Sequence, residues 1–243
     1  MPRPADPNAK VDLLRAAEAV FVERGLDHAK VEEITARAGH SKGSFYLHFG
    51  SKEDAFRQII ESMLARLATC LDQSAAMHHG ITVDNAADYL ARWRDNDTEM
   101  FEFIWANRRV VRLMLEGGGS ASFGYMIDQF ADRSREHTKR ILAWGVAIGL
   151  YRADLDVETA SLLLAGGYDR VAREVVRQER KPDLAALLAA VQRFCLVGLA
   201  APRLVAVIDS QVNNEGRSRP APGRIHAKPA GRRPRTVRRS PVP

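Results

Sequence analysis

Cysteine is scarce in this sequence: its 243 residues include only Cys70 and Cys195, far apart and without a C-x-x-C pair. Such spacing excludes a disulfide framework and is typical of reduced thiols. Long apolar runs are also lacking, since the longest uncharged one, near residues 194–201, is far too short to span a bilayer. The first ten residues contain no apolar core of a secretory signal peptide. We therefore expect a cytoplasmic protein that makes no use of a membrane.

An excess of basic charge is absent from most of the chain, although the whole sequence has 36 Lys and Arg against 30 Asp and Glu. Nine of the basic residues and one acid follow Ser210, which leaves 27 basic and 29 acidic residues in 1–210. The segment 211–243 is rich in Pro, Gly and Arg and has few large apolar residues, so we expect it to be disordered. The high net charge belongs to this tail and says nothing about nucleic-acid binding by the rest.

Alternating β-strand patterns are missing, and apolar residues recur at helical spacing almost everywhere. The sequence therefore predicts an all-α protein. The first expected helix starts at about Val11 and stops at Gly25, and three more cover 31–38, 42–49 and 52–77. Two helices follow at 84–106 and 107–116, before the glycine break at 117–119, and a long one carries 123–148. The last two are 157–178 and a helix that has Pro182 at its first position and ends or kinks at Pro202.

The pentapeptide Gly39-His40-Ser41-Lys42-Gly43 fits the G-x-S-x-G pattern of a serine hydrolase. That nucleophile elbow needs a strand leading into the serine, whereas residues 31–38 have a helical period. Ser41 is instead a favoured N-cap, and Gly39 suits the left-handed turn between two crossing helices. No acidic residue lies between Gly39 and Lys52. These features favour a DNA-reading helix-turn-helix, with an ordinary surface helix of a bundle as the alternative.

Two other constellations carry no chemistry. Cys70 with His78 and His79 lacks the ligand spacing of a zinc site, and the glycines at 117–119 lack the Lys-Ser/Thr that follows in a P-loop. We expect neither a metal nor a cofactor.

Four motifs lie within about residues 10–57: Phe21-x-x-x-Gly25, Ile34-Thr35-Ala36-Arg37-Ala38-Gly39-His40-Ser41, Gly43-Ser44-Phe45-Tyr46-Leu47-His48-Phe49 and Ser51-Lys52-Glu53. On these motifs the N-terminal quarter of the sequence resembles the TetR/AcrR family of one-component repressors. The resemblance implies a helix-turn-helix DNA-binding domain (10–57) and a helical effector-binding and dimerisation domain (58–210). We expect a flexible N-terminus (1–9) before them, and after them the tail (211–243), to which nothing is transferred from the family. Lys30, Thr35 and His40 depart from the family's usual Thr, Ala and Val.

The resemblance also implies roles for residues of the helix-turn-helix. The helix 42–49 would enter the major groove, where Lys42, Ser44 and His48 are candidates for contacts with base edges or phosphates. Tyr46 and Lys52 would clamp the DNA backbone, and Phe45 and Phe49 would be core. The remaining candidates for the DNA-binding surface are Lys30, His40, Ser41 and Gly43.

The second domain offers weaker signals. One helix carries Trp93, Met100 and Ile104 on a single face, and another carries Ser134 and His137 with Phe130 on an otherwise apolar face. These six residues suggest an effector pocket, and the alternative is that they belong to the ordinary hydrophobic core. Glycines inside a helix are costly, and close approach of helices across a dimer interface would explain them better than a local kink. The candidate interface residues are Gly166, Gly167, Val171, Val191 and Gly198.

Together these readings predict an all-α, homodimeric transcription regulator. We expect a repressor that binds double-stranded DNA at an inverted-repeat operator and is released by an apolar or aromatic small molecule. The alternative is an all-α enzyme, or a non-regulatory DNA-binding protein, that carries the same N-terminal domain.

Overall fold

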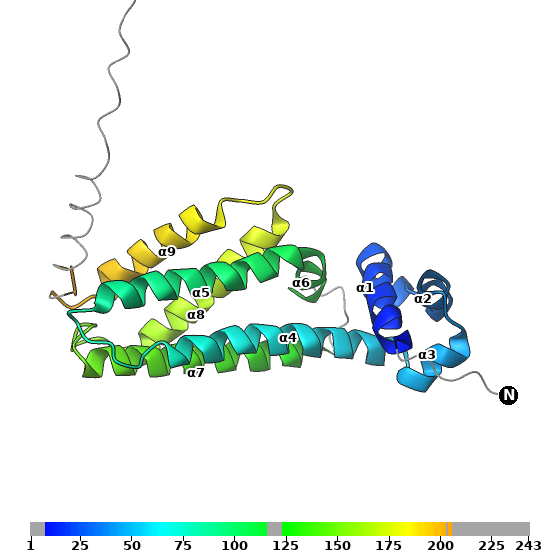
Figure 1. Ribbon diagram of the computed structural model, residues 1–243, viewed down its shortest axis with the longest axis horizontal. Coiled ribbons are helices and arrows are strands. Elements are labelled where there is room, and N and C mark those ends of the chain that lie inside the picture. The colour runs from blue at the N-terminus through cyan, green and yellow to red at the C-terminus, as the bar shows by residue number, and fades with distance from the viewer. Residues whose placement is uncertain (1–7, 116–122, 203, 206–243) are drawn as a thin grey trace, which may run out of the picture. The chain divides into compact units, whose positions relative to one another are not determined.

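The all-α prediction is confirmed by a computed structural model that describes residues 8–115, 123–202 and 204–205 (Figure 1). Within these ranges the backbone forms no strand, only an isolated bridge between Tyr151 and Ala200. The helices are α1 (Ala9–His28), α2 (Val31–Ala38), α3 (Lys42–His48), α4 (Lys52–Ala76), α5 (Ala86–Ala106), α6 (Arg108–Leu115), α7 (Gly124–Ala147), α8 (Val157–Arg177) and α9 (Leu184–Leu199).

Of the helices after α4, two start two residues later than predicted. The last helix begins at Leu184, because the Asp183 carboxylate accepts a hydrogen bond from the Ala186 N–H at 2.9 Å and caps it, so Pro182 precedes the cap. The fifth begins at Ala86 rather than 84, because the Asn85 side chain holds the preceding loop. The glycine break at 117–119, residues 1–7 of the expected flexible N-terminus and the expected disorder of 211–243 lie outside the described residues. Ala9, which was expected to be flexible, is instead a buried residue of α1.

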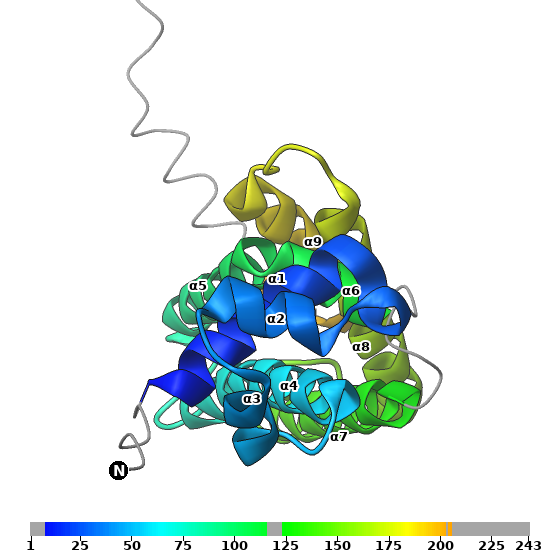
Figure 2. The same ribbon diagram turned by 90° about the vertical axis from the view of Figure 1, so that its right-hand side faces the viewer.

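The residues of α1, α2, α3 and the first turns of α4, here called the head (9–57), pack around aromatic side chains. Four of these rings are at most 1% exposed: Phe21, Phe45, Phe49 and Phe56. In Figure 2, α1, α2 and α3 face the viewer together with the start of α4. These rings fill the space between the helices, and their packing therefore holds the short α3 in place.

The remaining described residues, here called the body (58–205), are helices that run beside one another (Figure 1). Helix α7 packs on α8 and α4, and α5 packs on α9. The buried core continues from the head into the body through Phe56, whose ring lies 5.3 Å from that of Phe21 and 5.3 Å from that of Phe123. Helix α4 therefore belongs to both regions.

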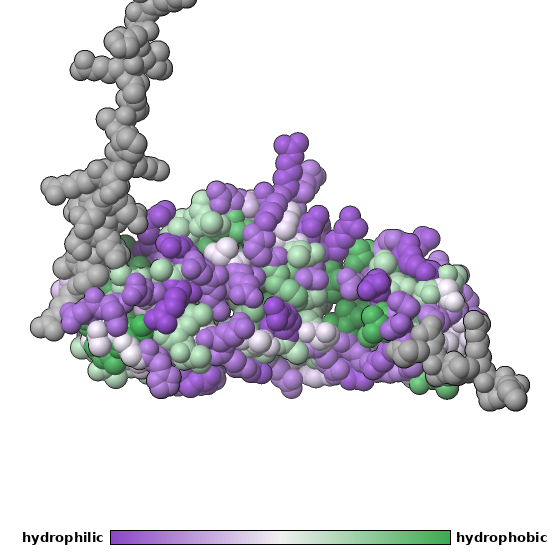
Figure 3. All heavy atoms as spheres, viewed as in Figure 1, coloured by the Kyte–Doolittle hydropathy of each residue, from purple (hydrophilic) through white to green (hydrophobic). Residues whose placement is uncertain are grey.

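The surface is mainly hydrophilic on the face drawn in Figure 3, with apolar patches between the charged side chains. None of the described helices combines the length and the apolar character that crossing a membrane requires.

Candidate DNA-reading head and effector cavity

The turn between α2 and α3 has the geometry that the sequence predicts. Gly39 is left-handed, at φ 71° and ψ 23°, and the His40 N–H donates to the Thr35 carbonyl at 3.0 Å. The Ser41 hydroxyl accepts a hydrogen bond from the Ser44 N–H at 3.1 Å, which caps α3. Since a helix leads into Ser41, the residue is a helix cap and not the nucleophile of a strand-to-helix elbow.

The three residues that depart from the family pattern all fit the head. Lys30 begins α2 without a side-chain capping bond, as expected when an ammonium replaces a hydroxyl. Thr35 is buried, and its hydroxyl donates to the Glu32 carbonyl at 3.2 Å. His40 is half-buried, with its imidazole 3.7 Å from the Asp12 carboxylate of α1. His40 therefore ties the turn to α1, and a contact between its ring and DNA stays a prediction.

Helix α3 exposes one continuous edge. Tyr46 is 57% exposed and Leu47 is 79% exposed, next to the exposed Lys42 and Gly43. Ser44 and His48 are half-buried. Leu47 was not among the residues predicted to contact DNA, because a leucine in a short helix is expected to lie in the core. Its exposure is informative, since an apolar side chain in a major groove can contact the methyl group of thymine.

Two lysines of the head already have protein partners. The Lys42 ammonium forms an ion pair with the Glu32 carboxylate, which raises the pKa of Lys42 and lowers that of Glu32. The Lys52 ammonium donates to the carbonyl oxygens of Asp27, at 2.8 Å, and Ala29, at 3.1 Å. Contact with DNA would thus replace the partner of Lys42, whereas Lys52 has one N–H left for a phosphate.

The N-terminus of α4 is capped by Ser51 in a variant of the capping box. The Ser51 hydroxyl accepts from the Asp54 N–H at 3.2 Å, but the Asp54 carboxylate accepts from the Gly50 N–H at 3.0 Å and not from Ser51. The shorter Asp side chain bonds one residue earlier than the Glu of a capping box. That bond holds the pKa of Asp54 below its usual value and fixes the link between α3 and α4.

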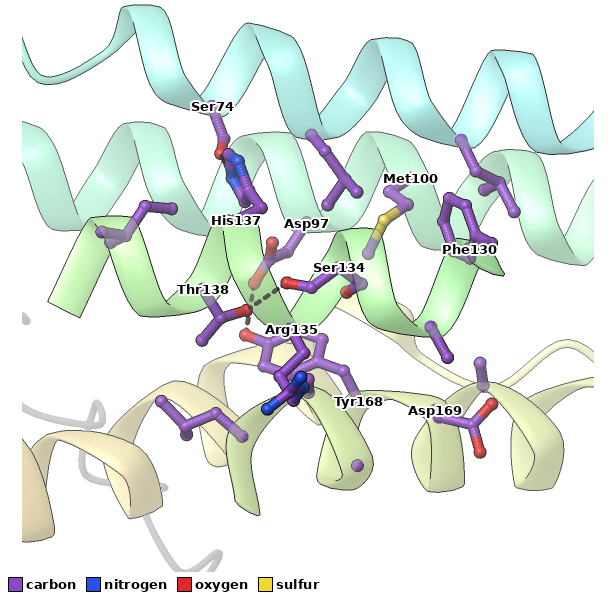
Figure 4. Close-up of a pocket in the computed structure, with 18 of the residues that line it drawn as sticks. Ser74, Asp97, Met100, Phe130, Ser134, Arg135, His137, Thr138, Tyr168 and Asp169 are labelled. Carbon is purple, nitrogen blue, oxygen red and sulfur yellow. Dashed lines mark hydrogen bonds between the residues drawn. The ribbon is translucent and has the colours of Figure 1, made fainter. Parts of the chain in front are cut away.

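A cavity of about 440 Å³ lies in the body, with walls from α4, α5, α6, α7, α8 and α9. All six residues proposed from the sequence as pocket residues line it: Trp93, Met100, Ile104, Phe130, Ser134 and His137. Figure 4 shows several of these side chains between the helices. The structure thus brings them to one space, and that an effector occupies it stays a prediction.

His137 lies on the cavity wall as a neutral polar group. Its Nε2 lies 2.6 Å from the Ser74 hydroxyl of α4. Burial, followed by the positive charge of Arg140, lowers the pKa of His137 to about 4. The imidazole therefore offers hydrogen bonding without charge at neutral pH.

A buried carboxyl group, Asp97, also lines the cavity and was not among the predicted residues. It is 8% exposed and accepts a hydrogen bond of 2.5 Å from the Tyr168 hydroxyl of α8 (Figure 4). Burial raises the pKa of Asp97 to about 7, against hydrogen bonds from Tyr168 and Trp93 that lower it. The sequence held one signal, because Asp97 lies four residues after Trp93 on the apolar face of α5.

The candidate interface residues are spread over α8 and α9. Gly166, Gly167 and Gly198 are exposed, and a Cβ atom at any of them would meet nothing within 4 Å. Val171 and Val191 are half-buried. Among the described residues, no neighbouring helix of the same protomer therefore touches these glycines. The same two helices expose large apolar side chains that the sequence reasoning did not single out: Leu162, Leu163, Phe194 and Val197.

Among the described residues no three His, Cys, Asp or Glu side chains lie together as a metal site would require.

Comparisons with known proteins agree with this geometry. Residues 13–59 match the model of the family described as bacterial regulatory proteins, tetR family. The HTH-type transcriptional repressor KstR2 of Mycobacterium tuberculosis is 30% identical over 150 residues, covering 60% of this chain and 71% of KstR2.

Two solved structures share the fold. SmeT, the repressor of the Stenotrophomonas maltophilia multidrug efflux pump SmeDEF, matches with a TM-score of 0.64 and 20% identity over 79% of this chain and 91% of SmeT. The transcriptional regulator FadR from Bacillus subtilis, in complex with stearoyl-CoA, matches with a TM-score of 0.59 and 21% identity over 77% of this chain and 98% of FadR.

A capped helix-turn-helix that continues into a hollow helical body places the protein among the helix-turn-helix transcriptional regulators. More specifically, the chain belongs to the TetR/AcrR family. The resemblance found in residues 10–57 is thereby confirmed, and with it the class of a DNA-binding transcriptional regulator.

Proposed function

We propose that this protein is a repressor that binds an inverted-repeat operator as a homodimer in the cytoplasm and leaves it when a small molecule fills the body cavity. The relatives support this reading, since KstR2 and SmeT are named repressors and FadR holds stearoyl-CoA. The observation that carries the proposal is the continuity between the cavity and the head.

That continuity is visible in residues that serve both regions. Met63, Ile104 and Met114 line the cavity and belong to the same buried cluster as Phe21 and Phe45 of the head. A ligand that moves these side chains also moves the packing that positions α3, because close-packed cores transmit strain. Release requires only that the ligand favour one body conformation by roughly 1–3 kcal/mol.

DNA reading is assigned to the exposed edge of α3. Lys42, Tyr46 and Leu47 would face the major groove, with Ser44 and His48 beside them and Lys30 and Lys52 at the phosphates. Gly43 would allow close approach of the backbone, because it is exposed and a Cβ there would meet only the Ser41 hydroxyl, at 3.6 Å.

Dimerisation is assigned to α8 and α9. Val197 is 88% exposed and Phe194 is 83% exposed on α9, and the exposed Leu163 lies on α8. Contiguous apolar groups at the surface mark an interaction site.

Val197→Glu should yield monomers in sedimentation, since a carboxylate costs little on a free surface and much in an apolar interface. Val11→Glu, at another exposed valine on α1, should leave the dimer intact. A dimer that survives Val197→Glu would remove α9 from the interface.

The proposal as a whole is tested on DNA that flanks the protein's own gene. The protein should retard this DNA in a gel at concentrations that leave shuffled DNA free, and a small molecule should reverse the shift without being converted to a product. Turnover of the molecule would instead favour the alternative, a helical enzyme that carries a DNA-binding head. A shift that no tested compound reverses would favour a DNA-binding protein without regulation.

A further inference from the structure

We propose that the effector of this protein is an organic cation, an apolar or aromatic amine whose ammonium group binds the Asp97 carboxylate inside the body cavity. This inference rests on the proposed function of the cavity and names the chemistry that the cavity selects.

The first observation is where the charged groups of the cavity lie. Asp97 is 8% exposed, and its described side-chain partners are Tyr168 and Trp93, with no basic side chain among them. Arg135 is the basic side chain on the cavity wall; it is 37% exposed and lies 3.7 Å from Glu136. The other carboxylates on the wall, Asp132 and Asp169, are exposed. Asp97 is therefore the one fully buried Asp, Glu, Lys or Arg on the described wall, whereas Arg135 is half-buried.

The second observation is how Asp97 is held. The Tyr168 hydroxyl donates to one carboxylate oxygen, and Figure 4 shows the two side chains pointing toward each other between α5 and α8. A carboxylate has about four lone-pair sites, so it can accept further donors. Since folding has already removed Asp97 from water, a bound ammonium need not desolvate it again, and the attraction is strong in a medium of low dielectric constant.

The third observation is the aromatic surrounding. Tyr89, Trp93, Phe101 and Tyr168 line the same cavity as Asp97. Aromatic faces attract cations and bind the apolar part of an amine equally well. The histidines of the wall add no positive charge, because burial lowers the pKa of both His78 and His137. An anionic ligand would meet the carboxylate without a buried counter-ion.

The test compares three probes with the same chain: decylammonium, 1-decanol and decanoate, each titrated into the full-length protein by calorimetry. Decylammonium should bind at least tenfold more tightly than decanol, and decanoate should be weakest. Asp97→Asn, which keeps an acceptor for Tyr168, should reduce decylammonium affinity to that of decanol. Asp95→Asn, a matched change at an exposed carboxylate of α5 that does not line the cavity, should leave the preference unchanged.

A pH series on the unmodified protein provides a second measurement that does not depend on a variant folding. Because the raised pKa of Asp97 is about 7, its charged fraction grows as pH rises through that value, and decylammonium affinity should rise several-fold while decanol affinity does not. Tyr89 on α5, Tyr168 on α8 and Cys195 on α9 also face Asp97; burial raises the pKa of each, so all stay neutral. The ammonium keeps its proton up to about pH 9, as a lysine does.

Equal affinity for the three probes, tightest binding of decanoate, no binding of any, or a preference that survives Asp97→Asn would each overturn the proposal. None of these results bears on DNA binding, which the retardation experiment measures separately. Conversely, a cation preference that depends on Asp97 but leaves the DNA shift unchanged would establish the site and contradict the proposed release mechanism.

Discussion

The head and the body use similar elements but differ in how completely their interiors are filled. Both are helical and both use buried aromatic rings, yet the rings of the head fill the space between short helices, whereas those of the body leave a cavity of about 440 Å³. A filled core resists deformation, while a cavity leaves its lining without partners on one side. The difference suits the head to present a fixed edge of α3 and the body to change shape around a ligand.

The most decisive test of this difference in packing replaces one phenylalanine in each region. Phe45→Ala in the head removes a fully buried ring and should lower the free energy of unfolding by about 3–5 kcal/mol. Phe130→Ala on the cavity wall should cost less than about 2 kcal/mol, because the half-buried ring already borders empty space. Denaturant unfolding measures both. Equal costs would mean that the cavity is no looser than the head.

Two glycines sharpen the picture of the body. A Cβ atom at Gly145 would lie 2.2 Å from the buried Tyr151 ring, so Gly145→Ala should destabilise the protein by about 1–3 kcal/mol. Gly124 at the start of α7 lies outside the helices assigned to the dimer interface, and a Cβ there would meet nothing within 4 Å, so Gly124→Ala should not lower the stability. Thermal unfolding should therefore shift down for Gly145→Ala and not for Gly124→Ala; an equal loss in both variants would contradict the close packing of Tyr151 on Gly145.

The head is tested by a pair of exposed tyrosines. Tyr46→Ala on α3 should weaken operator binding at least tenfold, about 1.4 kcal/mol, while Tyr125→Ala on α7, at similar exposure, should leave it unchanged. Circular dichroism serves as the folding control, because neither ring is part of the core. Unchanged operator affinity of a folded Tyr46→Ala protein would remove α3 from the DNA interface.

The smallest effect is expected from two surface ion pairs. Glu32→Gln frees Lys42 of the head and removes a negative charge beside α3, so DNA affinity should rise several-fold with little change in stability. Glu158→Gln breaks the matching pair with Lys139 in the body and should not change DNA affinity. Fluorescence anisotropy at two salt concentrations measures both, and an equal gain from the two variants would show a general charge effect.

Local signals in the sequence were enough for the head. The αL glycine at 39, the caps Ser41 and Ser51 and the helical period before the turn each act within a few residues, so the chain alone determines them. The all-α class follows from the same kind of periodicity. The start of α9 was misplaced by two residues, because Pro182 and Asp183 both favour a helix N-terminus and only the observed bond to Ala186 decides between them.

The body was determined by the sequence only in part. Its apolar stripes supplied six residues of the cavity wall, because a helix face can be read from spacing. Spacing does not say whether a face meets another side chain or empty space, because the volume of the cavity depends on side chains from six helices at once. Only the tertiary structure placed Asp97 beside Tyr168, 71 residues away, left Leu47 exposed and paired Lys42 with Glu32. The burial and charge environment of a site come from such non-local contacts, which is why its chemistry emerged only from the fold.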